Sequence, residues 1–104
     1  MRYIRRMSAY VIVDVEVKDL EKYQEYRKLA PAIVESYGGK YLARGNKIEV
    51  LEGDWTPKVM VVVEFESFER AKAWYDSPEY VAIRPGRQEN TTSKMILVDG
   101  VPKT

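Results

Sequence analysis

The stretch GGKYLARGNKIEVLEGDWTP, residues 38–57, contains the turns that set the order of the secondary structure. Gly38 and Gly39 are typical of a left-handed helix end, since glycine adopts positive φ without steric cost. Gly45-Asn46 indicates either a hairpin with two short arms or a bulge in one long strand over residues 40–52, and we favour the bulge. Residues 53–57 form a second turn, so a new strand is expected after Pro57.

Three further runs are typical of strands. Residues 9–17, AYVIVDVEV, alternate at period two, which indicates a strand with one face fully buried. Residues 59–65, VMVVVEF, are almost continuously apolar, as in a central strand covered on both faces. Residues 94–98 form the last predicted strand.

Helices are expected between these strands. Asp19 and Ser67 are typical N-caps of amphipathic segments. Ser77-Pro78 starts a short helix that Pro85-Gly86 should end or break, and Pro31 should kink or restart the first helix. The resulting order is strand, helix, strand, strand, helix, strand. It predicts an α+β ferredoxin-like βαββαβ fold with a four-stranded antiparallel sheet and both helices on one face.

Composition excludes many kinds of chemistry. The chain has 104 residues, no cysteine and no histidine, so we expect one domain without disulfides, thiolate nucleophiles or His-based triads. Cys or His metal sites and haem with a proximal histidine are excluded as well. We therefore expect no metal site and no cofactor.

Charge and hydropathy bear on partners. A net charge of +1 and a central strand without the stacking aromatics of RNA-binding domains predict no nucleic-acid partner. The basic residues Arg2, Arg5 and Arg6 are interpreted as a solvated tail. No apolar run reaches transmembrane length, so we expect a cytoplasmic protein without a membrane partner.

Only two Gln and two Asn occur, which is typical of a thermophilic source. We divide the chain into an extension (1–8), one domain (9–101) and a tail (102–104).

The second face of the predicted sheet is also apolar. A monomer would leave this face in water, and an apolar patch of that kind usually marks an interface. The sequence therefore predicts a two-fold homodimer with the sheets face to face. The face carries Ile12, Met60, Val62, Ile96 and Val98.

Taken together, six motifs resemble the bacterial and archaeal family known as domain of unknown function 1330, over roughly residues 9–101. They are Leu29-Ala30-Pro31-Ala32, Tyr37-Gly38-Gly39, Leu42-Ala43-Arg44-Gly45, Glu49-Val50-Leu51-Glu52-Gly53 with Trp55, Glu64-Phe65-Glu66-Ser67-Phe68-Glu69 and Ser77-Pro78-Glu79-Tyr80. The resemblance implies a dimeric α/β barrel of ferredoxin-like subunits. That superfamily includes cofactor-free antibiotic-biosynthesis-type monooxygenases and muconolactone isomerase-like enzymes, while the family itself has no established activity. Gly45-Asn46 replaces the usual two glycines, and residues 1–7 have no counterpart in the family.

Candidate catalytic residues come from the strands. Asp14 and Glu64 share the face of Ile12 by parity, and Arg44 lies on a neighbouring strand. Two carboxylates and a guanidinium near apolar walls could act as a general acid and base or clamp a carboxylate ligand. The alternative is an ion-pair network across the dimer interface.

Candidate ligand-binding residues come from the helices and the second turn. Arg84 and Arg87, which match arginines of the family, would neutralise an anionic ligand or form surface ion pairs. Tyr26, Trp74 and Tyr80 face the sheet and line either a pocket or simply the core. Trp55 is interpreted as a pocket lid or a dimer contact.

Three functions remain open on this basis. The first is a cofactor-independent monooxygenase or isomerase that acts on a small apolar or anionic molecule. The second is a non-catalytic binder of such a ligand, and the third is a module whose dimerisation is its whole function. An aromatic cavity that contains charged head groups would favour the first two.

Overall fold

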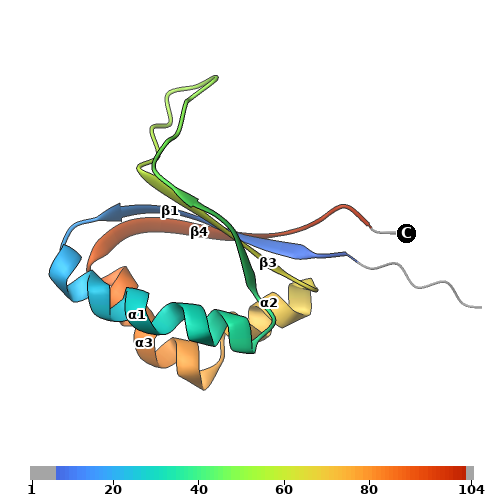
Figure 1. The fold of residues 1–104 in the computed structure, drawn as a ribbon. Helices are drawn as coiled ribbons and strands as arrows, with labels where there is room; N and C mark the ends of the chain where they lie inside the picture. Colours follow the sequence, from blue (N-terminus) through green and yellow to red (C-terminus); the bar gives the residue numbers. More distant parts are fainter. Residues whose placement is uncertain (1–6, 103–104) are drawn as a thin grey trace, which may run out of the picture.

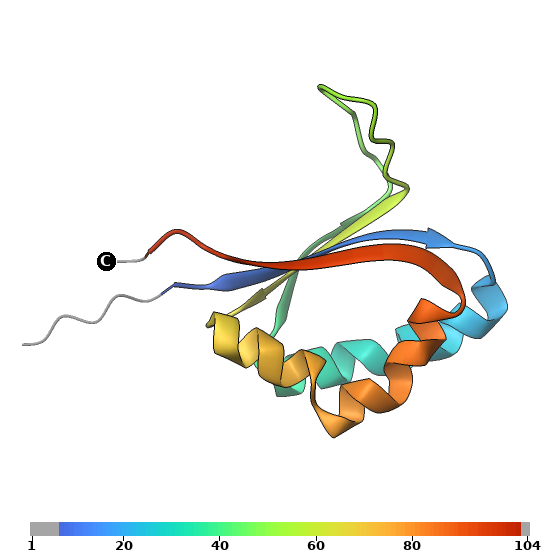
Figure 2. The same cartoon turned by 180° about the vertical axis from the view of Figure 1, so that it is seen from behind.

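Four antiparallel strands form one sheet, and three helices cover one of its faces (Figures 1 and 2). The computed structural model describes residues 7–102. The predicted ferredoxin-like α+β fold is confirmed, with strand order β2-β3-β1-β4. The strands are β1 (Ala9–Val17), β2 (Lys40–Gly45), β3 (Val59–Phe65) and β4 (Thr91–Asp99). Most of the predicted extension (1–8), with Arg2, Arg5 and Arg6, and most of the tail (102–104) lie outside the described residues.

The three helices begin at the predicted caps. They are α1 (Leu20–Ser36), α2 (Phe68–Tyr75) and α3 (Pro78–Gln88). The side chain of Asp19 accepts a hydrogen bond from the Lys22 amide at 3.1 Å. Ser67 and Ser77 accept equivalent bonds at 3.0 and 3.1 Å. Each cap satisfies a donor that the first helical turn leaves free.

Two prolines lie inside helices that continue past them. The predicted break at Pro85-Gly86 and restart at Pro31 are wrong, because α3 runs to Gln88 and α1 runs to Ser36. A proline in a helix interior loses one backbone hydrogen bond. Residues on both sides of each proline are buried, Ala30 and Val34 in α1 and Tyr80 and Arg87 in α3. Their packing outweighs the lost bond.

The second strand differs from the prediction. It ends at Gly45, whose partner is Met60, and β3 begins only one residue earlier at Val59, so a longer β2 would have no strand to pair with. The predicted bulge lies between Tyr41 and Ala43, at Leu42, rather than at Gly45-Asn46. Residues 46–58, here called the arm, project from the sheet on the side away from the helices (Figure 1).

The helix-facing side of the sheet forms the core, as parity predicts. Its buried members from the sheet are Val11, Val13, Val15, Val63 and Phe65. None of the helices within residues 7–102 packs on the opposite side, where Ile96 is 59% exposed and Val98 is 42% exposed (Figure 1). No helix in the part of the chain that the structure describes is long and apolar enough to cross a membrane.

The turn between α1 and β2 is unusually tight. Gly38 has φ of +82°, which confirms the predicted left-handed helix end. Gly39 has an ordinary φ, but a Cβ there would lie 2.5 Å from Val34 Cγ1 and 2.9 Å from the Phe65 ring. The two glycines therefore serve different needs, backbone conformation at Gly38 and close packing at Gly39.

Candidate functional site

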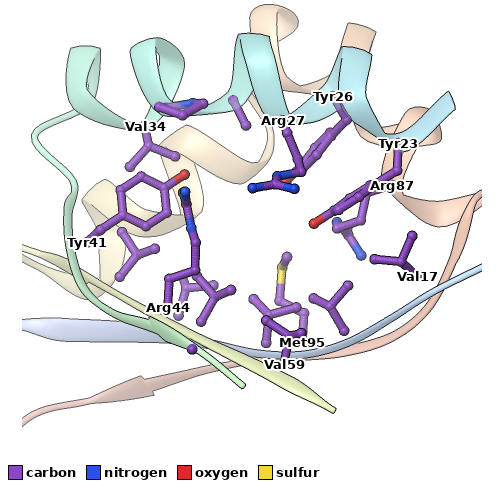
Figure 3. A pocket seen from close by; sticks show the side chains of 18 of the residues that line it. Val17, Tyr23, Tyr26, Arg27, Val34, Tyr41, Arg44, Val59, Arg87 and Met95 are labelled. Atoms are coloured by element: carbon purple, nitrogen blue, oxygen red, sulfur yellow. The ribbon is translucent and has the colours of Figure 1, made fainter. Parts of the chain in front are cut away.

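A cavity of about 300 Å³ lies between the helices and the sheet (Figure 3). Its floor consists of valines from β1 and β3 and of Met95 from β4. Its roof comes from α1, where Tyr23, Tyr26 and Ala30 face the sheet. This volume is at the lower end of the range typical of small-molecule sites.

Three arginines from three different elements line the cavity, and no aspartate or glutamate among the described residues does. Arg27 comes from α1, Arg44 from β2 and Arg87 from α3, and all three side chains extend into the cavity (Figure 3). Like charges at the border of an apolar cavity create a positive potential that attracts anions. The cavity therefore has an apolar body and a cationic lining.

Arg87 is the most deeply placed of these cations, with only 5% of its surface exposed. Its Nη1 donates to Ser93 Oγ at 2.7 Å, and its Nε donates to the Tyr80 hydroxyl at 3.4 Å. Burial lowers its pKa, but Tyr80 and Tyr26 raise it, and the net direction is upward, so the guanidinium is charged at neutral pH. Within residues 7–102 no carboxylate forms an ion pair with it. A buried cation without a counter-charge is costly, and an anion beside it would offset that cost.

Tyrosines supply the remaining polar atoms near the cavity. The Tyr26 and Tyr80 hydroxyls are 2.7 Å apart, and the Tyr23 and Tyr26 rings stack with centroids 5.6 Å apart. Burial raises the pKa of Tyr23, Tyr26 and Tyr41 above the ordinary value of 10.0. These hydroxyls are therefore protonated at neutral pH and can donate hydrogen bonds, but they are poor bases.

The raised pKa values of these tyrosines predict that the folded protein loses stability at alkaline pH. A tyrosine whose folded pKa lies above its unfolded pKa keeps its proton longer in the folded state. Its contribution is complete below pH 10 and declines above it, by up to about 1.4 kcal/mol per pH unit for Tyr26, whose pKa is raised furthest. Urea unfolding from neutral pH to about pH 11 should show this decline, and Tyr26→Phe should reduce its slope. If tyrosinate absorbance shows all eight tyrosines of the folded protein ionising together near pH 10, the interpretation is wrong.

Trp74 adds an unpaired donor to the lining. The residue is 3% exposed, and its ring lies against Phe65 and Tyr80. Its indole N–H is buried without a hydrogen-bond partner among the described residues. Such a donor costs about 1–3 kcal/mol when it is left unsatisfied. An acceptor atom of a bound molecule is one way to satisfy it.

The structure does not bring the three predicted catalytic residues together. Asp14 pairs with Met60, and Glu64 pairs with Tyr10, so both carboxylates lie on the sheet face opposite the helices. The two pairs are four residues apart along β1. Arg44 pairs with Val61 and lines the cavity on the helix side. The expectation that the three residues cluster is wrong. The extra residue at Leu42 puts Arg44, like Tyr41, on the helix side of the sheet, away from both carboxylates.

Asp14 and Glu64 have other partners on that outer face. Trp55 Nε1 donates to Asp14 Oδ2 at 2.9 Å, and the Tyr10 hydroxyl donates to Glu64 Oε2 at 3.3 Å. Trp55 belongs to the arm, is 55% exposed and does not line the cavity. Asp14 and Trp55 border a separate, more open depression of about 570 Å³. Its other lining residues are Glu16, Asp54, Thr56, Lys58, Thr92 and Lys94.

The other predicted ligand-binding residues divide into two groups. Tyr26, Trp74 and Arg87 line the cavity, and Tyr80 supports it through bonds to Tyr26 and Arg87. Arg84 lies elsewhere. Its Nη1 donates to the Tyr75 carbonyl at 3.3 Å, and its guanidinium lies 4.5 Å from the centre of the Tyr75 ring. Arg84 thus braces the junction of α2 and α3 and does not line the cavity.

Two cavity residues were missed by the sequence analysis. Arg27 lies four residues after Tyr23 and four before Pro31, and a charged residue within the inward stripe of a helix is a signal that could have been used. Tyr41 faces inward together with Arg44 only because of the bulge, whose position the sequence did not reveal. The Arg44 guanidinium lies 4.6 Å from the centre of the Tyr41 ring.

The fold and the cavity define this chain as a ferredoxin-like α+β protein with a ligand-sized space between helices and sheet. The family model "Domain of unknown function (DUF1330)" matches residues 8–101, so the chain belongs to this family, as the motifs indicated. No curated protein matches the sequence significantly.

Several solved structures share the fold. RPA0582 of Rhodopseudomonas palustris, a protein of unknown function, is 19% identical with a TM-score of 0.75, over 90% of this chain and 82% of its own. A dimeric ferredoxin-like protein of unknown function from Jannaschia is 9% identical with a TM-score of 0.69, over 88% and 97%. SnoaB of Streptomyces nogalater, a cofactor-independent oxygenase, is 10% identical with a TM-score of 0.59, over 97% of each chain. Because these identities are all 19% or lower, the comparisons with solved structures establish the fold alone.

Proposed function

We propose that this protein binds a small amphipathic anion, such as an aromatic or aliphatic acid, in the cavity between α1 and the sheet. The observation that carries the proposal is Arg87, a buried guanidinium that lines an apolar cavity and has no carboxylate partner within residues 7–102. Arg27 and Arg44 extend the cationic lining, and the valine floor suits an apolar body. A ligand with an anionic end and an apolar body matches all of these features.

The binding proposal can be tested with a pair of probes that differ mainly in charge. Benzoate should bind, whereas benzamide, which is neutral and has nearly the same shape, should bind much more weakly. Arg87→Met should weaken benzoate binding by about 2 kcal/mol, roughly 30-fold, because it removes a charge-assisted hydrogen bond. Isothermal titration calorimetry would measure both affinities.

Two controls separate a binding role of Arg87 from a structural one. Arg84→Met makes the same chemical change outside the cavity and should leave benzoate affinity unchanged. The unfolding free energy of ligand-free Arg87→Met should change by less than about 1 kcal/mol, because methionine fills the site without a buried charge. If neither probe binds, or if Arg84→Met and Arg87→Met weaken binding equally, the proposal fails.

The enzyme hypothesis, a cofactor-independent monooxygenase or isomerase, makes a different demand on the same cavity. A general base must accept a proton near neutral pH. The ionisable side chains that line the cavity are arginines, which stay protonated, and tyrosines, whose pKa values do not favour the anion. The cationic lining would instead stabilise an anion that the substrate itself forms. Binding is therefore the function that the geometry supports best, and catalysis would have to start from a substrate that is already ionised.

We also propose that the protein forms a homodimer through the uncovered sheet face. The exposed Ile96 and Val98 on that face support this, and so does the dimeric state described for the Jannaschia protein. The cavity lies on the opposite side of the sheet, so binding and dimerisation use different faces of the same strands.

A further inference from the structure

The cations that line the cavity lie at opposite edges of the sheet. Arg44 belongs to β2, which is one edge strand. Arg87 bonds to Ser93 of β4, which is the other edge strand. Figure 3 shows Arg44 and Tyr41 at one end of the cavity and Arg87 and Tyr23 at the other, with Arg27 between them on α1. The cavity therefore has two polar ends.

The floor between these ends is apolar. It is formed by the two central strands, β1 and β3, through Val11, Val13, Val15, Val59, Val61 and Val63. Neighbouring strands lie about 4.8 Å apart, so the backbones of β2 and β4 are separated by roughly 14 Å. Both arginines reach inward across part of this distance. The remaining gap suits a short apolar spacer, such as one aromatic ring.

We infer that the ligand carries two separate anionic groups joined by a short apolar spacer, with one group held by Arg87 and the other by Arg44. This inference rests on the proposed binding function and specifies its ligand class. A single anionic group could contact only one of these two arginines. A ligand with both charges on one group, such as a phosphate monoester, would have the same limitation.

Four aromatic probes test the inference by calorimetry at one ionic strength. Benzoate carries one charge, and benzene-1,4-dicarboxylate carries two at opposite ends of the ring. Benzene-1,2-dicarboxylate carries the same two charges side by side, and phenyl phosphate carries its charge on one group. The 1,4-diacid should bind at least about tenfold more tightly than each of the others, because it alone forms charge-assisted contacts at both ends.

Arg44→Met should remove this advantage, so that the 1,4-diacid binds no more tightly than benzoate does, whereas Arg87→Met should weaken the binding of both ligands. Lys40→Met is the matched control, since Lys40 lies on the same strand, pairs with Glu64 and faces away from the cavity. It should leave the preference for the 1,4-diacid intact. The Arg44 side chain is exposed, so the variant should fold normally.

The outcomes separate this inference from the function on which it rests. If no probe binds, the binding function itself fails. If benzoate binds and the 1,4-diacid binds no better, only the two-ended ligand is excluded. If phenyl phosphate or the 1,2-diacid binds more tightly than the 1,4-diacid, the cavity binds anionic charge at one end only, and the inference is wrong. An Arg44→Met variant that keeps the full preference for the 1,4-diacid would also overturn the inference.

Discussion

Replacing Ile96 with glutamate should break the proposed homodimer into monomers of 12.1 kDa. Ile96 is 59% exposed on the uncovered sheet face and lies beside Ile12 on the neighbouring strand. A carboxylate buried in an apolar interface without a partner is strongly unfavourable, so we expect dimer affinity to fall at least about 100-fold. Light scattering at micromolar concentration would measure the change in mass.

Leu29→Glu is a suitable control, because Leu29 is an equally large, half-exposed residue on α1, on the helix side of the molecule. This variant should remain dimeric. The exposure of Ile96 also means that the fold of the single chain does not depend on it. A dimer that survives Ile96→Glu would place the interface elsewhere, and a wild-type mass of 12.1 kDa would exclude the dimer altogether.

Gly39→Ala should lower the unfolding free energy by about 3 kcal/mol, the upper end of the usual cost of overpacking. The added methyl group would lie 2.5 Å from Val34 Cγ1 and 2.9 Å from the Phe65 ring. Both neighbours are fully buried core residues, so neither can move aside cheaply. Urea denaturation would measure the loss.

Gly38→Ala provides the comparison one residue earlier. A methyl group on Gly38 would have no neighbouring atom within 4 Å, but the φ of +82° disfavours any other residue at this position. Alanine there should cost only about 1 kcal/mol, the usual penalty for a left-handed conformation. Equal losses at the two positions would mean that packing against Val34 and Phe65 does not decide the cost at Gly39.

Much of the fold could be predicted from local chemistry. The alternating valines of β1 determine which side of the sheet is buried, and the caps at Asp19, Ser67 and Ser77 determine where the helices begin. The family motifs were equally clear. β4 begins at Thr91 rather than at Lys94, since Thr91 and Thr92 pair with β1 although no apolar alternation marks them as strand. Such tertiary effects leave little trace in the sequence.

The site was harder to predict because it depends on register and on the packing of separate elements. Parity placed Asp14 and Glu64 on one face correctly, but the position of the bulge decides where Arg44 points. The burial of Arg87 depends on how α3 packs against β4, and the sequence of α3 does not reveal this. An arginine on a helix is usually solvated, so only the structure distinguishes Arg87 from Arg84.

The bulge at Leu42 has an evolutionary consequence. One extra residue in β2 sets the side of the sheet on which every later side chain of the strand emerges. Deleting Leu42 would remove the bulge and keep Arg44 opposite Val61, whereas deleting Ala43 with the bulge retained would move Arg44 opposite Val62, on the outer face. A one-residue insertion or deletion that leaves the bulge in place therefore changes which side chains of β2 face the cavity, without any substitution.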